Sequence, residues 1–114
     1  MRTLTKGRNF QLWEYHVSHG SLLIRSPAGP GVETSVDIIC VGVEYLAVAR
    51  HLGEITLSQA TEAEVNHLEK VLGKKLSPSH VWALENTSDR FLLVAVNVKI
   101  RVHHGDIFES PFGS

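Results

Sequence analysis

The sequence predicts an α+β fold: a largely antiparallel, curved β-sheet or half-barrel of about six or seven strands, with one amphipathic helix packed against it. Residues 91–103 alternate apolar and polar side chains over the length of a long strand. Short turn-forming segments join most of the apolar runs, which favours antiparallel pairing. Only residues 62–72 space their apolar side chains as a helix does.

The first two strands are expected at 10–17 and 22–26, paired as a hairpin. If the turn is two residues long, Glu14 lies opposite Arg25, which makes an opposite-charge pair on one face. The same register gathers the apolar side chains on the other face: Trp13, Tyr15, Val17, Leu22 and Ile24.

Residues 34–43 are predicted to form a central strand because the side chains on both of its faces are apolar. Gly42 inside this run indicates a bulge or a bend. Residues 50–53 are expected to turn the chain, and further strands are expected at 54–58 and 81–85.

The helix at 62–72 begins with a capping-box pattern, in which Glu64 follows the cap residue Thr61 by three positions. Gly73 is suited to end the helix in a left-handed conformation. The apolar stripe that should face the sheet consists of Val65, Leu68 and Leu72, joined at its edge by Val71.

The long strand at 91–103 is apolar at every even position, which predicts one face buried along its whole length. Its odd positions are apolar at first and polar later. The first half is therefore expected to be covered on both faces, and the second half on one.

With 114 residues, the chain is expected to form a single globular domain, 1–114, whose first eight residues are flexible. The net charge is −1, so the protein lacks the excess of positive charge that is typical of proteins that bind nucleic acid or membrane surfaces. The only cysteine, Cys40, cannot form an internal disulfide, and no signal peptide is evident. A cytoplasmic location is the expectation.

Two residues in the central strand could carry chemistry. Cys40 lies among apolar residues, which predicts a buried, inert thiol. Asp37 also lies in an apolar run, so it needs a cationic partner if it faces inward. Arg25 or Arg101 could reach it if their strands are neighbours, and this ion pair is favoured over an active-site carboxylate.

The seven histidines do not match the spacing of a known metal motif. His103 and His104, with Asp106, are the weak candidates for a metal site, and no cofactor is expected. Exposed histidines in turns and at strand edges are the preferred interpretation.

Two sets of residues could form a binding site. Four aromatic side chains could line a small-molecule pocket in a curved sheet, although the same residues could fill the core: Trp13, Tyr15, Tyr45 and Trp82. A polar half-face could contact a partner, although a solvated sheet face would look the same: Glu14, His16, Arg25, Asn97, Lys99, Arg101 and His103.

Residues 12–26 read LWEYHVSHGSLLIRS, and together with 36–37 and 42–45 they resemble a hairpin found in small uncharacterised bacterial proteins. The resemblance covers roughly the first half of the chain and implies no activity.

The leading expectation is a non-enzymatic protein that binds another protein, either a different chain or a second copy of itself. An immunity or antitoxin-like role is its most concrete form, by analogy of size and fold class. One alternative is a small-ligand-binding or metal-binding domain. The other is a minor enzyme, which requires a carboxylate or histidine with a strongly shifted pKa in a cleft.

Overall fold

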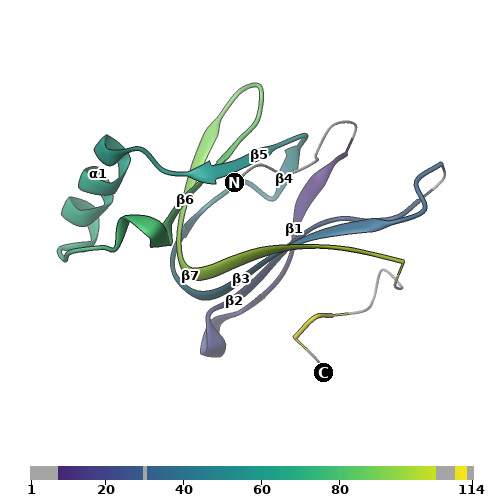
Figure 1. Cartoon of the computed structure of the whole chain (residues 1–114), viewed down its shortest axis with the longest axis horizontal. Coiled ribbons are helices and arrows are strands. Elements are labelled where there is room, and N and C mark those ends of the chain that lie inside the picture. Colours follow the sequence, from purple (N-terminus) through teal and green to yellow (C-terminus); the bar gives the residue numbers. More distant parts are fainter. Residues whose placement is uncertain (1–7, 30, 105–109, 113–114) are drawn as a thin grey trace.

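The computed structural model describes residues 8–29, 31–104 and 110–112. In this part of the chain, seven antiparallel strands form one sheet in the order β4-β1-β2-β3-β7-β6-β5 (Figure 1). The predicted α+β class is confirmed. The strands are β1 (Phe10–His16), β2 (Ser21–Ser26), β3 (Ser35–Ala47), β4 (His51–Gly53), β5 (Thr56–Gln59), β6 (Val81–Glu85) and β7 (Arg90–His103).

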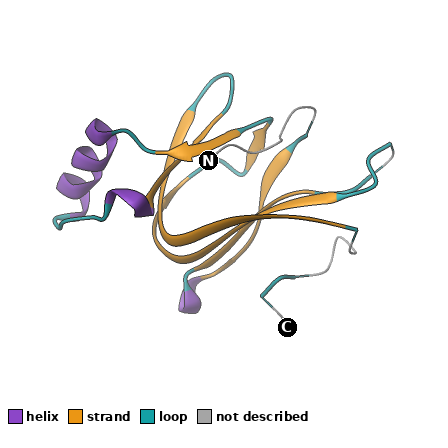
Figure 2. Ribbon diagram, in the orientation of Figure 1, coloured by secondary structure: helices purple, strands orange, loops and turns teal. Residues whose placement is uncertain are grey.

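The sheet curls into a half-barrel because its two edge strands follow each other in the chain. Only Glu54 and Ile55 separate β4 from β5. The side-chain amide of Asn86, in the turn after β6, adds a link to the edge strand β4, since it donates to the carbonyl of Leu52 over 2.9 Å. The long strands β3 and β7 curve around the interior (Figure 2). The core inside the curl includes Phe10, Leu22, Ile24, Ile38, Cys40, Leu57, Leu84 and Leu93.

The sheet bends at Gly42, as its place in the sequence predicted. Gly42 has a left-handed φ of +69°, and a Cβ there would lie 2.8 Å from Cγ2 of Val96. Before the bend, the β7 side chains that pack on the interior are at odd positions; after it they are at even positions, beginning with Val98. The prediction of one β7 face buried throughout is therefore wrong, and Val96 and Val102 are both 62% exposed.

The helix α1 spans Glu62–Leu72, as predicted, and both hydrogen bonds of the capping box are present. Gly73 ends it in the left-handed conformation. The helix covers the outer side of the β6–β7 ribbon at one end of the sheet (Figure 2). The cluster it forms there contains Val65, Leu68, Val81 and Val94. The first half of β7 is thus covered on both faces, as expected.

The hairpin of β1 and β2 exists, but its predicted register is wrong. The connection is a 3-10 turn, Val17–His19, completed by Gly20 in the left-handed conformation. The longer turn sets Glu14 opposite Leu23 instead of Arg25. It also leaves Val17 78% exposed, so Val17 does not join an apolar face. The turn is fixed by its contact with β3, because the carbonyl of Gly20 accepts from the amide of Val43 over 2.8 Å.

Two smaller differences concern segments outside the central strands. The predicted turn at 50–53 contains the edge strand β4. Of the segment expected to be flexible, residues 1–7 lie outside the described residues, and Arg8 donates two hydrogen bonds to Thr34. In the described part of the chain, no helix is long and apolar enough to cross a membrane.

Candidate functional site

One face of the neighbouring strands β1, β2, β3 and β7 points away from the core of the half-barrel and carries charged and polar side chains beside the buried Leu23 and Ile39. Directly paired residues share a face, so Arg25, Asp37 and Arg101 lie side by side across β2, β3 and β7. We call this surface the polar face. It brings together all the residues predicted as a partner surface, together with Asp37: Glu14, His16, Arg25, Asn97, Lys99, Arg101 and His103.

The centre of the polar face is a buried ion cluster around Asp37. Arg25 and Asp37 are both fully buried, and the guanidinium donates to the two carboxylate oxygens over 2.6 and 3.0 Å. Arg101 donates to Oδ2 of Asp37 over 3.1 Å, and Nε2 of His103 lies 2.9 Å from the same oxygen. The predicted ion pair of Asp37 is confirmed with both arginines.

The electrostatics of the cluster keep Asp37 ionised. Burial alone would raise the pKa of Asp37, but the hydrogen bonds and charge of Arg25, helped by Arg101 and His103, lower it below its usual value. The Trp13 ring lies 5.4 Å from the guanidinium carbon of Arg25 and makes a cation–π contact. Trp13 stands at a bulge in β1, between Leu12 and Glu14. The arrangement suits a structural charge more than a group that exchanges protons.

A second polar cluster lies on β1, where Ser110 and Phe112 contact the polar face. The Glu14 carboxylate contacts the ring of His16 and accepts from the hydroxyl of Ser110 over 3.1 Å. The ring of Phe112 packs edge-on against His16, with 5.7 Å between centroids. The hydroxyl of Ser110 donates to the carboxylate, whereas in a hydrolytic triad the histidine accepts the proton of the serine.

Exposed apolar side chains interrupt the polar surface near the bend. Val41 is 45% exposed and lies opposite Asn97, and the neighbouring Val96 is 62% exposed. Asn97 and Lys99 beside them are exposed as well. We call Val41 and Val96 the valine patch.

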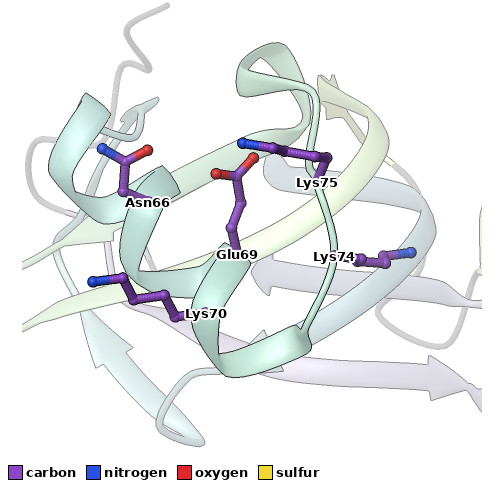
Figure 3. Close-up of a pocket in the computed structure, with 5 residues that line it drawn as sticks. All are labelled: Asn66, Glu69, Lys70, Lys74 and Lys75. Carbon is purple, nitrogen blue, oxygen red and sulfur yellow. The ribbon is translucent and has the colours of Figure 1, made fainter.

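A separate groove lies between α1 and the loop that follows it (Figure 3). It encloses about 550 Å³. We call it the helix groove; it is lined by Asn66, Glu69, Lys70, Lys74 and Lys75. The sequence did not predict this groove, since the return of the loop beside α1 leaves no local pattern.

The four aromatic residues proposed as a pocket lie in different surroundings. Trp82 is buried in the core of the half-barrel, and Tyr45 packs against the cluster under α1. Trp13 covers Arg25, and Tyr15 is paired with Leu22 and 40% exposed.

Cys40 and the histidines are the remaining side chains that could carry chemistry. Burial raises the pKa of the Cys40 thiol to about 12, which leaves it protonated at neutral pH. His103 contacts Asp37, His104 is exposed, and Asp106 lies outside the described residues. Within the described ranges, no group of three or more His, Cys, Asp or Glu side chains could hold a metal ion.

Comparisons with protein-family models, with curated proteins and with solved structures gave no significant match. The resemblance of residues 12–26 to small bacterial proteins therefore stays an expectation.

Proposed function

We propose that this protein acts by binding another protein, and that the valine patch with its polar surroundings is the contact surface. The observation that carries the proposal is the exposure of Val41 and Val96 beside Asn97 and Lys99 on two paired strands. An apolar centre with a polar rim is the usual anatomy of a protein interface.

The surface suits recognition because it is held rigidly. Val41 and Asn97 lie on β3 and β7, whose pairing extends over most of both strands. The buried ion pair between Arg25 and Asp37 ties β2 to β3 further along the same face. A preorganised surface loses little conformational entropy when it binds, which favours affinity.

The charged groups of the polar face support binding over catalysis. The Asp37 carboxylate is held by three cationic or polar partners, and the Glu14 carboxylate is engaged by His16 and Ser110. These contacts hold both carboxylates in one geometry, and the lowered pKa of Asp37 keeps that group ionised. An immunity or antitoxin-like role is one form of this proposal, in which the partner is a toxin encoded nearby.

The test compares Val96→Lys with the matched variant Val71→Lys, which changes an exposed valine on α1. Light scattering after size exclusion measures self-association, and affinity capture from native cells, followed by reconstitution with the purified partner, measures binding to another protein. We expect wild type and Val71→Lys to bind, and Val96→Lys to bind at least about tenfold more weakly, as for a residue in the centre of an interface. Equal binding by all three proteins would contradict the proposal, as would a wild-type protein with no partner and no self-association.

A further inference from the structure

Residues 110–112 lie against β1 on the outer side of the curled sheet, where Figure 1 draws them in yellow. We call them the C-terminal segment. The hydroxyl of Ser110 donates to the carboxylate of Glu14, and the ring of Phe112 packs edge-on against His16. The amide of Phe112 donates to the hydroxyl of Ser110 over 3.2 Å, which holds the hydroxyl and the ring in a fixed relation. The segment therefore presents a hydroxyl group and an aromatic ring, two residues apart, to one small area of β1.

The surface that receives the C-terminal segment consists of two side chains on the same side of β1. Glu14 and His16 occupy alternate positions of the strand, so both project onto the polar face. The carboxylate of Glu14 contacts the His16 ring, and each group keeps the other in place. With the segment docked, 26% of the Glu14 side chain and 42% of the His16 side chain are still exposed. A competing segment can therefore reach both groups from solvent.

The C-terminal segment is held by few contacts. Among the described residues, no backbone hydrogen bond joins it to the sheet, and its attachment consists of the Ser110 hydrogen bond and the Phe112 ring contact. A hydrogen bond and an aromatic contact of these kinds favour the docked arrangement only on the order of tenfold. The segment can thus be replaced by another segment that makes the same two contacts.

The site on β1 lies within reach of a partner bound at the valine patch. His16 pairs with Ser21, which lies beside Val41 because the next pair along the two strands is Leu22 with Cys40. Only β2 separates β1 from β3, so the distance across is about 10 Å at the usual strand spacing. A partner that covers about 800 Å² extends about 16 Å from the centre of its contact. A partner of ordinary size centred on the valine patch therefore meets the C-terminal segment.

We propose that Glu14 and His16 form a docking site for a short segment of the partner protein that offers a hydroxyl group and, two residues later, an aromatic ring. The C-terminal segment occupies the site in the free protein, and the partner displaces it. The chemistry of the occupant follows from the segment seated there, because a competitor must supply a donor to Glu14 and a ring to His16. Displacement by the partner rests on the proposed function, whereas the docking site itself does not.

The probe is the blocked peptide SPFGS, which repeats residues 110–114, titrated into the isotope-labelled full-length protein. The emptied variant, Ser110→Ala with Phe112→Ala, lacks the competing contacts, so it should bind the peptide on the order of tenfold more tightly than wild type. Saturable amide shifts should appear at Glu14 and His16, and the peptide APAGS should cause none. In the emptied variant, His16→Ala should weaken peptide binding at least about threefold. The matched change His67→Ala, at an exposed histidine on α1, should leave it unchanged.

Equal affinity of wild type and the emptied variant for SPFGS would overturn the docking site. Saturable shifts away from β1, or no saturable binding of the emptied variant at low millimolar peptide, would do the same. Val96→Lys should bind the peptide as wild type does, which separates this result from the test of the valine patch.

The second arm uses the partner purified after affinity capture. The emptied variant should bind it on the order of tenfold more tightly than wild type, because no segment has to be displaced. Unchanged affinity would overturn the displacement and leave the valine patch as the contact surface. Weaker binding would also overturn it, because the C-terminal segment would then be part of the interface.

Discussion

Arg25 and Asp37 form a bidentate ion pair in which both side chains are fully buried. The pair joins two neighbouring strands at directly opposed positions, Arg25 on β2 and Asp37 on β3. Burial of two charges is costly unless their geometry satisfies both, and here the guanidinium reaches both carboxylate oxygens. The pair therefore fixes the register of the sheet that carries the proposed contact surface.

Removal of the Asp37 carboxylate should destabilise the fold strongly. Asp37→Ala leaves Arg25 buried without its partner, and we expect a loss of about 3 to 5 kcal/mol in the free energy of unfolding. Urea denaturation followed by circular dichroism measures it. Asp89→Ala, an exposed change in the turn before β7, should stay within about 0.5 kcal/mol. A loss below about 1 kcal/mol for Asp37→Ala would show that the cluster is not structural.

Acid should remove the contribution of the same carboxylate. The pKa of Asp37 is lower in the folded protein than its ordinary value of 3.8, so the unfolded state binds more protons and stability rises with pH through this range. The stabilisation is complete above pH 3.8 and is lost as the pH falls through the folded value. Thermal unfolding midpoints between pH 7 and pH 2 measure the loss.

Two variants separate Asp37 from the other acid with a depressed pKa. Arg101→Gln should reduce the pH dependence, because the pKa of Asp37 then lies closer to its ordinary value. The pKa of Glu64 is lowered to about 2, chiefly by its hydrogen bonds with Arg90, so Glu64→Gln removes a second contribution of the same sign. Arg101→Gln with an acid transition as steep as that of wild type would contradict the assignment to Asp37.

The bend of the half-barrel should depend on Gly42. Gly42→Ala adds a Cβ at a left-handed φ, 2.8 Å from Cγ2 of Val96, and we expect a loss of about 1 to 3 kcal/mol. The double variant with Val96→Ala should recover the part due to the steric contact. Gly29→Ala is the control, because a Cβ there meets nothing within 4 Å. Equal stability of the two glycine variants would show that the bend does not need glycine.

Cys40 should report global unfolding and not local chemistry. Its thiol is fully buried in the core, and burial raises its pKa to about 12. A thiol reagent such as Ellman's reagent should therefore react only at the rate at which the protein opens, and that rate should rise with urea. Rapid reaction in the absence of denaturant would mean that the interior of the half-barrel is open to solvent.

The sequence predicted those features that local patterns determine. Residues close together in the sequence determine the capping box at Thr61 and Glu64 and the apolar stripe of α1. The bend likewise follows from a single glycine, Gly42, inside an apolar run. The need of Asp37 for a cation was also evident, because a carboxylate in an apolar strand must be paired.

The features that were missed depend on contacts between distant parts of the chain. The β1–β2 register follows from a turn held against Val43, and the contact of Ser110 with Glu14 spans 96 residues. The exposure of Val96 follows from the change of facing residues at the bend, which the unbroken alternation of β7 concealed. The helix groove depends on where the loop after α1 returns, and the spacing of its lysines gives no information on that.

The most direct test of the proposed contact surface is a chemical-shift map of the isotope-labelled protein, titrated with its purified partner or, for self-association, with itself. The account predicts that the amide signals of Val41, Val96, Asn97 and Lys99 shift together and saturate, and that Val96→Lys removes these changes. Saturable shifts confined to the edge strands β4 and β5, with those four signals unmoved, would contradict it.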